Sequence, residues 1–360
     1  MLALCALCLL CVAAPCAHAA SPAWRPDAPL ASHAMLYLDA PFSFKETMFQ
    51  QSAELGARAI RVDLALTAVF TADGSEDWRG VDEVMALARG YGLRPVGVLL
   101  ATPWFIAACG AEPYSYTCPP ADLEAWKRMV SKIVAHTRGI IDTFEILNEP
   151  DGRWAFTGSA ADYAKLLRAG HDATKAANPD ARVAIAGTMG LASRPWLAQV
   201  FAQAGPHPER LYDIVNVHIR ASLRQLPGTL RAWRRFFAAH RSSEKPLWIT
   251  EFGYPSDPAY QYDRAYHAGP ASQASYLCHA IPILLAHRAA KVFLTLRDNL
   301  GGPFASEGVI TGGVSDPPAA DPLVVRKPAF AALSRLATLH DWASIRPLAS
   351  LAGSAAYRFR

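Results

Sequence analysis

Eight short apolar segments recur along the chain and alternate with longer stretches of helical spacing. The segments are rich in β-branched residues and begin at Ala34, Ala57, Arg94, Ile141, Ala181, Tyr212, Pro246 and Ala290. Strands that are apolar almost throughout need cover on both faces, which indicates a parallel sheet enclosed by helices. Eight such strand–helix units close into a (β/α)₈ barrel. We therefore predict an α/β protein that forms a single (β/α)₈ domain of the TIM-barrel type.

The intervening stretches carry recognisable helix signals. In residues 119–139 the apolar side chains fall on one helical face, namely Leu123, Trp126, Val130, Ile133 and Val134. Ser159 to Asp162 resemble a capping box at the start of another helix. The last helix is predicted over residues 327–340, after a long turn-rich segment at 301–326 of the kind that shapes substrate sites in barrels.

Composition narrows the class of protein. The chain has 360 residues, of which 52% are hydrophobic and 18% charged, so it can bury a large core. Its net charge of +4 is spread thinly, without a dense basic run, and we expect no nucleic-acid partner. We expect a monomer.

The N-terminal residues indicate export. Residues 1–20 form an apolar stretch too short to span a bilayer, ending in a small-residue pattern, and we interpret them as a cleaved signal peptide. Cys5, Cys8 and Cys11 have the spacing of an iron–sulfur motif, but no suitably spaced fourth cysteine follows. The barrel would then occupy residues 21–340, and residues 341–360 would pack on it or begin an accessory β element. We expect an extracytoplasmic protein, periplasmic or secreted, without stable membrane insertion after cleavage.

Three cysteines remain after the signal. Cys109 and Cys118 bracket a polar, turn-rich loop and are expected to form a disulfide in an oxidising compartment, the alternative being two free thiols. Cys278 lies in an apolar helical pattern and is expected to be a small core residue.

Two glutamates stand at the ends of predicted strands. Glu149 ends the fourth strand and Glu251 the seventh. In a barrel, the carboxyl ends of the strands face one shared pocket. Two carboxylates there can approach to about 5 Å, the separation that a double-displacement glycosidase needs. A solvated loop carboxylate is the alternative for each glutamate alone, but the pair is far more informative.

Other strand ends supply supporting groups. Arg61 and Asp63 lie on the second strand, and an arginine beside a carboxylate keeps that carboxylate ionised as a nucleophile. A buried Arg61–Asp63 ion pair is the structural alternative. His218 ends the sixth strand, where it could bind the acid, bind a sugar hydroxyl, or be a core histidine. No second histidine or cysteine lies at ligand spacing from it, so we expect no metal site.

Aromatic residues follow several of the same strands. They are Trp104, Trp154, Tyr254 and Phe304. Rings at a cleft offer apolar faces on which sugar C–H groups stack. Loop packing is the alternative for each ring alone, but four around one mouth favour a carbohydrate groove.

The motifs FEILNEPD (144–151) and WITEFGYPS (248–256) resemble those around the acid/base and the nucleophile of clan A glycoside hydrolases. Over the barrel, from Ala34 to His340, the chain is most similar to family 39, which includes β-xylosidases, α-iduronidases and exopolysaccharide-cleaving enzymes. The resemblance implies roles for the matching residues: Glu149 as acid/base, Glu251 as nucleophile, Asn148 on the sugar 2-hydroxyl, and Arg61 and His218 beside them.

The chain departs from the resemblance at two places. Arg220 stands where many clan members have a tyrosine that donates to the nucleophile, and Tyr254 is one candidate for that role. The eighth strand offers residues 296–299 (Leu-Arg-Asp-Asn) where some members have a tryptophan platform. Both departures concern the part of the site nearest the cleaved bond.

Together these observations predict an exported retaining glycoside hydrolase that acts on a polysaccharide or oligosaccharide, of exopolysaccharide or hemicellulose type, without a cofactor. Three alternatives stay open at this point. A non-catalytic polysaccharide-binding barrel would keep the aromatic groove. A transglycosidase would share both glutamates, and a metal-dependent hydrolase would need clustered ligands.

Overall fold

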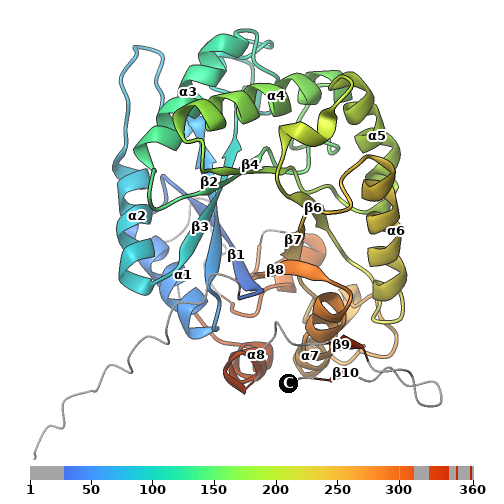
Figure 1. Ribbon diagram of the computed structural model, residues 1–360. Coiled ribbons are helices and arrows are strands. Elements are labelled where there is room, and N and C mark those ends of the chain that lie inside the picture. Colours follow the sequence, from blue (N-terminus) through green and yellow to red (C-terminus); the bar gives the residue numbers. More distant parts are fainter. Residues whose placement is uncertain (1–27, 300, 312–323, 340–345, 348–356, 359–360) are drawn as a thin grey trace, which may run out of the picture.

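The computed structural model describes residues 28–299, 301–311, 324–339, 346–347 and 357–358. Eight parallel strands form one sheet in the order β5-β4-β3-β2-β1-β8-β7-β6 (Figure 1). Their bounds are β1 Leu30–Tyr37, β2 Ala59–Ala65, β3 Arg94–Leu100, β4 Thr143–Ile146, β5 Arg182–Ile185, β6 Val215–His218, β7 Leu247–Phe252 and β8 Ala289–Thr295. A parallel bridge between Ala184 and Ile214 joins the two edges. The predicted (β/α)₈ barrel is confirmed.

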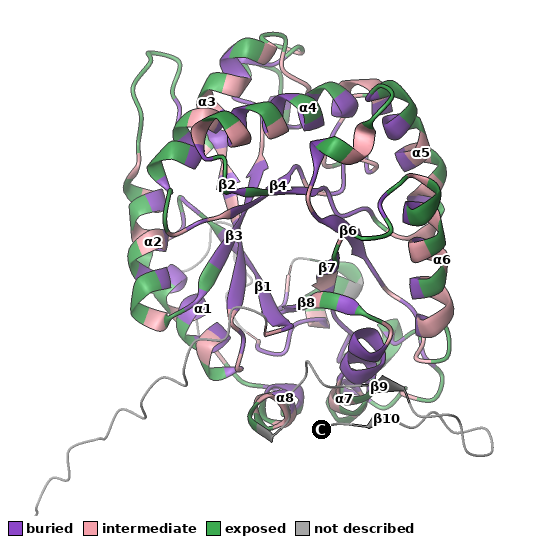
Figure 2. Cartoon of the chain, viewed as in Figure 1, coloured by how far each residue is buried: buried purple, intermediate pink, exposed green. Residues whose placement is uncertain are grey.

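In the described part of the chain, eight α-helices surround the strands. They are α1 Phe42–Glu54, α2 Arg79–Tyr91, α3 Leu123–His136, α4 Ala160–Ala177, α5 Arg194–Gln203, α6 Leu226–Ala239, α7 Pro270–Ala286 and α8 Pro328–Leu339. Short 3₁₀ helices lie between them: η1 Leu66–Ala68, η2 Trp104–Ile106, η3 Ser115–Thr117, η4 Leu191–Ser193, η5 Pro208–Leu211, η6 Pro258–Tyr260 and η7 Gly302–Ser306. The strands are buried almost throughout, whereas the helices alternate between buried and exposed residues (Figure 2).

Local sequence explains where two of these helices begin. On α3 four of the five apolar residues of the predicted face are buried and Leu123 is half-buried against the core. Asp122 caps the helix by accepting from the Ala125 amide. At the start of α4, Ser159 and Asp162 form the predicted capping box. Each cap satisfies amide groups that the first helical turn leaves without partners.

Two strand boundaries differ from the prediction, the start of β1 and the end of β4. The first strand begins at Leu30, four residues before the predicted start, because Leu30 and Ala31 pair with β8. The fourth strand, β4, ends at Ile146, so Glu149 lies in the loop that follows it and not in the strand. The sequence pattern did not show the end of β4, because no glycine or proline separates the apolar run from Asn148 and Glu149.

The barrel interior is layered. Apolar residues fill the layer nearest the amino ends of the strands: Ala31, Ala59, Val96, Ala184, Ile214, Trp248 and Phe293. Two positions further along five of these strands the inward residues are buried and polar: His33, Arg61, Asn216, Thr250 and Thr295. Side chains two residues apart share a face of a strand. The interior therefore changes from apolar to polar toward the carboxyl ends, where TIM barrels carry their sites.

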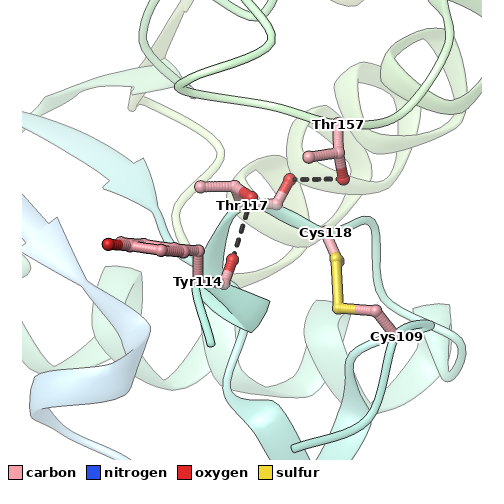
Figure 3. The surroundings of a disulfide bond; sticks show 5 residues. All are labelled: Cys109, Tyr114, Thr117, Cys118 and Thr157. Carbon is pink, nitrogen blue, oxygen red and sulfur yellow. Dashed lines mark hydrogen bonds between the residues drawn. A yellow bond between two sulfur atoms is a disulfide. The ribbon is translucent and has the colours of Figure 1, made fainter. Parts of the chain in front are cut away.

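The predicted disulfide is present between Cys109 and Cys118 (Figure 3). The Thr117 carbonyl within the closed loop accepts from the amide of Thr157, which follows β4. The bridged loop is thereby tied to the loop that carries Glu149. Cys278 is half-buried on α7 and packs against the core, so it is less enclosed than predicted.

The two ends of the chain are described only in part. The predicted signal peptide lies outside the described residues. In the tail, β9 Arg346–Pro347 pairs antiparallel with β10 Tyr357–Arg358, and both lie beside α7 (Figure 1). Over the described part of the chain, none of the helices has the length and hydropathy that crossing a bilayer requires.

Candidate active site

A cavity of about 660 Å³ opens at the carboxyl ends of the strands. Its lining includes both predicted catalytic glutamates, Glu149 and Glu251. One carboxylate oxygen of Glu149 and one of Glu251 lie within 4.8 Å of each other. Retaining glycosidases hold their two carboxyl groups about 5 to 5.5 Å apart, and inverting enzymes hold them farther apart to admit a water. The arrangement therefore has the geometry for double displacement.

Local backbone features aim these two side chains at the cavity. Leu147 and Glu149 have φ values of 63° and 41°, a left-handed conformation that costs a non-glycine residue roughly 1 kcal/mol or more. On β7, His218 pairs with Glu251 while Val217 pairs with Ile249, so the register shifts by one residue. Such a bulge re-aims side chains. It lets Glu251 reach the cavity although Thr250, its neighbour, already faces inward.

Four basic groups surround the Glu251 carboxylate. Its Oε1 lies 3.2 Å from Arg61 Nη1 and 3.9 Å from His33 Nε2, and its Oε2 lies 3.5 Å from His218 Nδ1 and 3.7 Å from Arg220 Nη2. Burial alone would raise the pKa of Glu251, but attraction to His218 and to the guanidinium groups of Arg61 and Arg220 outweighs burial and holds the pKa well below its usual range. Glu251 is ionised, as a nucleophile must be.

Arg61 links several of these groups. Its guanidinium donates to both oxygens of the fully buried Glu145 at 2.9 and 3.1 Å, and to Asn148 Oδ1 at 2.7 Å. The alternative Arg61–Asp63 ion pair is absent from the described structure, because Glu145 occupies the fork of the guanidinium. Arg61 is only 2% exposed but lines the cavity, where it holds both Asn148 and Glu251.

Asn148 lies at the cavity wall. Because its Oδ1 accepts from Arg61, its amide nitrogen is the group that is left to donate to a ligand. This is compatible with the expected contact to a sugar hydroxyl.

His33 is a site residue that the sequence reasoning missed. Its Nδ1 lies 2.9 Å from Arg61 Nη1, which can only donate, so Nδ1 accepts. Burial chiefly lowers the pKa of His33 to about 3, and the ring is neutral with its proton on Nε2, facing Glu251. The only signal was a histidine inside an apolar run, and a strand predicted to begin at Ala34 left it out.

His218 contacts the acid rather than the substrate. Its Nδ1 lies 2.6 Å from Glu149 Oε1, and its Nε2 lies 3.1 Å from the Thr250 hydroxyl, which itself donates to Asn216. The ring is fully buried and does not line the cavity, so of the three alternatives given for His218 the contact with the acid is the one that the structure shows. Burial disfavours the charged ring, but Glu251 and Glu149 together raise the pKa of His218.

Arg220 is held by a partner that the sequence reasoning did not identify. Its Nε and Nη2 each donate to one oxygen of the buried Glu307 at 2.9 Å, and its guanidinium lies 4.7 Å from the centre of the Phe304 ring. Gly253 makes room for this pair, since a Cβ there would fall 2.3 Å from Glu307 Cγ. Arg220 therefore occupies the place beside the nucleophile where the resemblance led us to expect a tyrosine.

Tyr254 does not take over that role. Its side chain is fully buried, its hydroxyl donates to the carbonyls of Tyr266 and Asp263, and its ring stacks on Tyr276. The prediction that Tyr254 binds substrate is wrong, because the chain after β7 turns this ring into the packing against α7.

The aromatic lining differs from the prediction in its members. Trp154 and Phe304 line the cavity as expected. Trp104 does not, because η2 turns it outward, where it is 52% exposed and meets Phe105 edge-on. Three unpredicted rings, those of Tyr37, Tyr116 and Phe156, line the cavity as well. Tyr116 comes from the disulfide-bridged loop, which gives that bridge a place in shaping the site.

Glu149, His218 and Glu251 also form a cluster with metal-ligand atoms. Two guanidinium groups, those of Arg61 and Arg220, lie within 3.7 Å of the same carboxylate and repel a divalent cation. The charges around the cluster fit proton transfer and nucleophilic attack better than metal binding.

No protein-family model matches the sequence, and no curated protein is significantly similar to it. Solved structures do share its fold. A family 39 glycoside hydrolase from the gut symbiont Bacteroides cellulosilyticus is 16% identical, with a TM-score of 0.70 over 92% of this chain and 67% of that one. A family 39 enzyme from Xanthomonas axonopodis pv. citri is 18% identical, with a TM-score of 0.63 over 87% of this chain and 66% of that one.

A third structure is a family 39 β-xylosidase from Caulobacter crescentus, 20% identical, with a TM-score of 0.61 over 90% of this chain and 76% of that one. The chain thus spans about two thirds of the length of the first two structures. At these identities the similarity establishes the shared barrel fold.

Proposed function

We propose that this protein is a retaining glycoside hydrolase that cleaves O-glycosidic bonds of a polysaccharide or oligosaccharide. The observation that carries the proposal is the pair of carboxylates, Glu149 and Glu251, within 4.8 Å at the carboxyl ends of β4 and β7. The similarity of the fold to family 39 enzymes and the aromatic cavity lining support it.

In the first step, a carboxylate oxygen of Glu251 attacks the anomeric carbon while Glu149 gives its proton to the leaving glycosidic oxygen. The C–O bond breaks and a glycosyl ester on Glu251 forms. In the second step Glu149 takes a proton from water, whose oxygen attacks the same carbon and releases Glu251. Configuration is retained because the carbon is inverted twice.

The neighbouring residues have distinct tasks in these steps. The cationic groups around Glu251 keep it ionised for attack. In the second step they stabilise the negative charge that returns to Glu251 as the ester bond breaks. His218 holds Oε1 of Glu149, which leaves the other oxygen to exchange the proton with the substrate. Asn148 is placed to donate to a hydroxyl of the bound sugar.

The test compares the wild type with Glu149→Gln and Glu251→Gln on a panel of aryl glycosides and polysaccharides. We expect each variant to lose at least about a thousandfold in kcat. Glu244→Gln is the matched control, since that glutamate is exposed beyond the amino end of β7. Azide added to Glu251→Ala should yield a glycosyl azide of inverted configuration, whereas NMR of the wild-type product should show retention.

Other outcomes would change the assignment. Variants as active as the wild type would remove these glutamates from the mechanism. Binding of glycans without cleavage would favour a non-catalytic barrel, and transfer to an added sugar in preference to water would favour a transglycosidase.

We also propose that the protein is exported, with residues 1–20 as the signal. The bond between Cys109 and Cys118 supports this, because such bonds persist in oxidising compartments. Mass spectrometry of the protein from periplasmic and culture fractions tests the proposal. A mature chain that begins near residue 21 is expected, and uncleaved protein confined to the cytoplasm would contradict it.

A further inference from the structure

Asp63 is a carboxylate at the cavity wall that the mechanism above does not use. It follows Arg61 by two positions on β2, so both side chains face the barrel interior. It lines the cavity and is half-buried, opposite Tyr37 in the strand register. Among the described residues, no side chain or amide donates a hydrogen bond to it, and no cation lies within ion-pair distance.

The cations of the cavity are already paired. Arg61 is held by Glu145 and lies beside Glu251, and Arg220 is held by Glu307 and lies beside Glu251. The neutral ring of His33 adds no charge. Among the described lining residues, negative charge is therefore left over, and Asp63 is the carboxylate without a donor.

We propose that Asp63 is a specificity-determining residue that binds hydrogen-bond donors of the glycosyl unit in this cavity, either the hydroxyls of a neutral sugar or the ammonium of an amino sugar, and disfavours uronic acids. This inference rests on the proposed glycosidase function and deepens it.

The physical reason is the cost of a half-buried carboxylate without donors, which a ligand that supplies donors removes. A sugar carboxylate would instead bring a further negative charge beside Asp63 and Glu251. The cavity environment already works against ionisation. Burial above all raises the pKa of Asp63 to about 6; Glu251 and Glu145 add to this rise, and the more distant charges of Arg61 and Arg297 offset part of it.

The experiment uses matched substrates. Aryl glycosides and oligosaccharides of the gluco, galacto and manno series are each tested in neutral, 2-amino, N-acetylated and uronate forms, with wild type and Asp63→Asn. We expect a neutral or 2-amino form to be cleaved best. Asp63→Asn should lower kcat/KM for that form between about 10-fold and 150-fold, mainly through KM, since hydrogen bonds to a charged group are lost.

Two further readouts separate binding from a structural effect. The acid limb of the wild-type kcat/KM profile near pH 6 should disappear in Asp63→Asn. Asp180 is an exposed aspartate just before the amino end of β5, and Asp180→Asn should leave kcat/KM and its dependence on pH unchanged. N-acetylation that abolishes cleavage of a preferred 2-amino substrate identifies the ammonium as the bound group, and a preferred neutral form identifies hydroxyls.

Two outcomes would overturn the inference: a uronate is the best substrate, or Asp63→Asn equals the wild type on the best substrate. The proposed function would still stand in both cases if Glu149→Gln and Glu251→Gln are inactive. If nothing is cleaved, the proposed function fails, and calorimetric binding of the same oligosaccharides decides the inference by the same criteria. Tightest binding of the uronate form, or no binding of any form, then counts against it.

Discussion

Gly187→Ala tests the contact between His218 and the predicted acid without changing a charge. Gly187 follows β5, and a Cβ added there would lie 2.1 Å from Nε2 of His218 and 2.5 Å from its Cδ2. The imidazole ring would have to retreat by about 1.3 Å to reach ordinary van der Waals contact at 3.4 Å.

Contacts at both ring nitrogens oppose this movement. It is fully buried between Glu149 at 2.6 Å and Thr250 at 3.1 Å, so a shift of that size breaks at least one of the two hydrogen bonds. Losing a charge-assisted hydrogen bond costs about 1.5–3 kcal/mol, which corresponds to a fall in kcat of about 10-fold to 150-fold. The overpacked methyl group should also lower the free energy of unfolding by about 1–3 kcal/mol.

The assay measures kcat and KM over pH on the best substrate, with thermal unfolding of the same samples. Gly90→Ala is the matched control, because that exposed glycine lies in α2 with nothing near its missing Cβ, and alanine there should stabilise slightly. A folded Gly187→Ala enzyme with unchanged kcat and pH profile would refute the role given to the Glu149–His218 contact.

Three further predictions concern other parts of the site. Glu307→Gln, which leaves Arg220 with one neutral partner, should reduce kcat about 10-fold to 100-fold with little change in KM, because the guanidinium can then shift onto the nucleophile; an unchanged kcat would contradict this. The raised pKa of Asp63 means that the folded state binds its proton more tightly than the unfolded chain, so stability declines as pH rises from about 3.8 to about 6. Asp63→Asn should remove that decline and raise the free energy of unfolding at pH 7 by about 1–3 kcal/mol. Denaturation at pH 4 and pH 7 measures this, and the same pH dependence in wild type and variant would contradict the prediction. Replacing Cys109 and Cys118 by serine should cost up to about 3 kcal/mol for a loop of about 10 residues and raise KM more than it lowers kcat; equal KM values would separate the bridge from the cavity.

Local sequence determined the barrel and part of its site. The repeat of apolar strand and amphipathic helix is a short-range signal, and it was sufficient to predict eight parallel strands. The capping box at Ser159 and the paired cysteines depend on neighbours within about ten residues, and both are present. Glu149 and Glu251 were predicted to share one pocket because every parallel strand of a barrel ends at the same rim.

Tertiary structure decided the partners and directions of the remaining side chains. Arg220 meets Glu307, 87 positions away, and Arg61 meets Glu145, 84 positions away, rather than the nearer Asp63. Tyr254 follows a strand just as Trp154 does, yet one is enclosed against α7 and the other faces the cavity. At a strand end, a bulge or one left-handed residue reverses the face on which a side chain lies, and the sequence pattern does not record which occurs. The type of chemistry could therefore be predicted from strand ends, whereas the charges that tune it depend on contacts between distant segments.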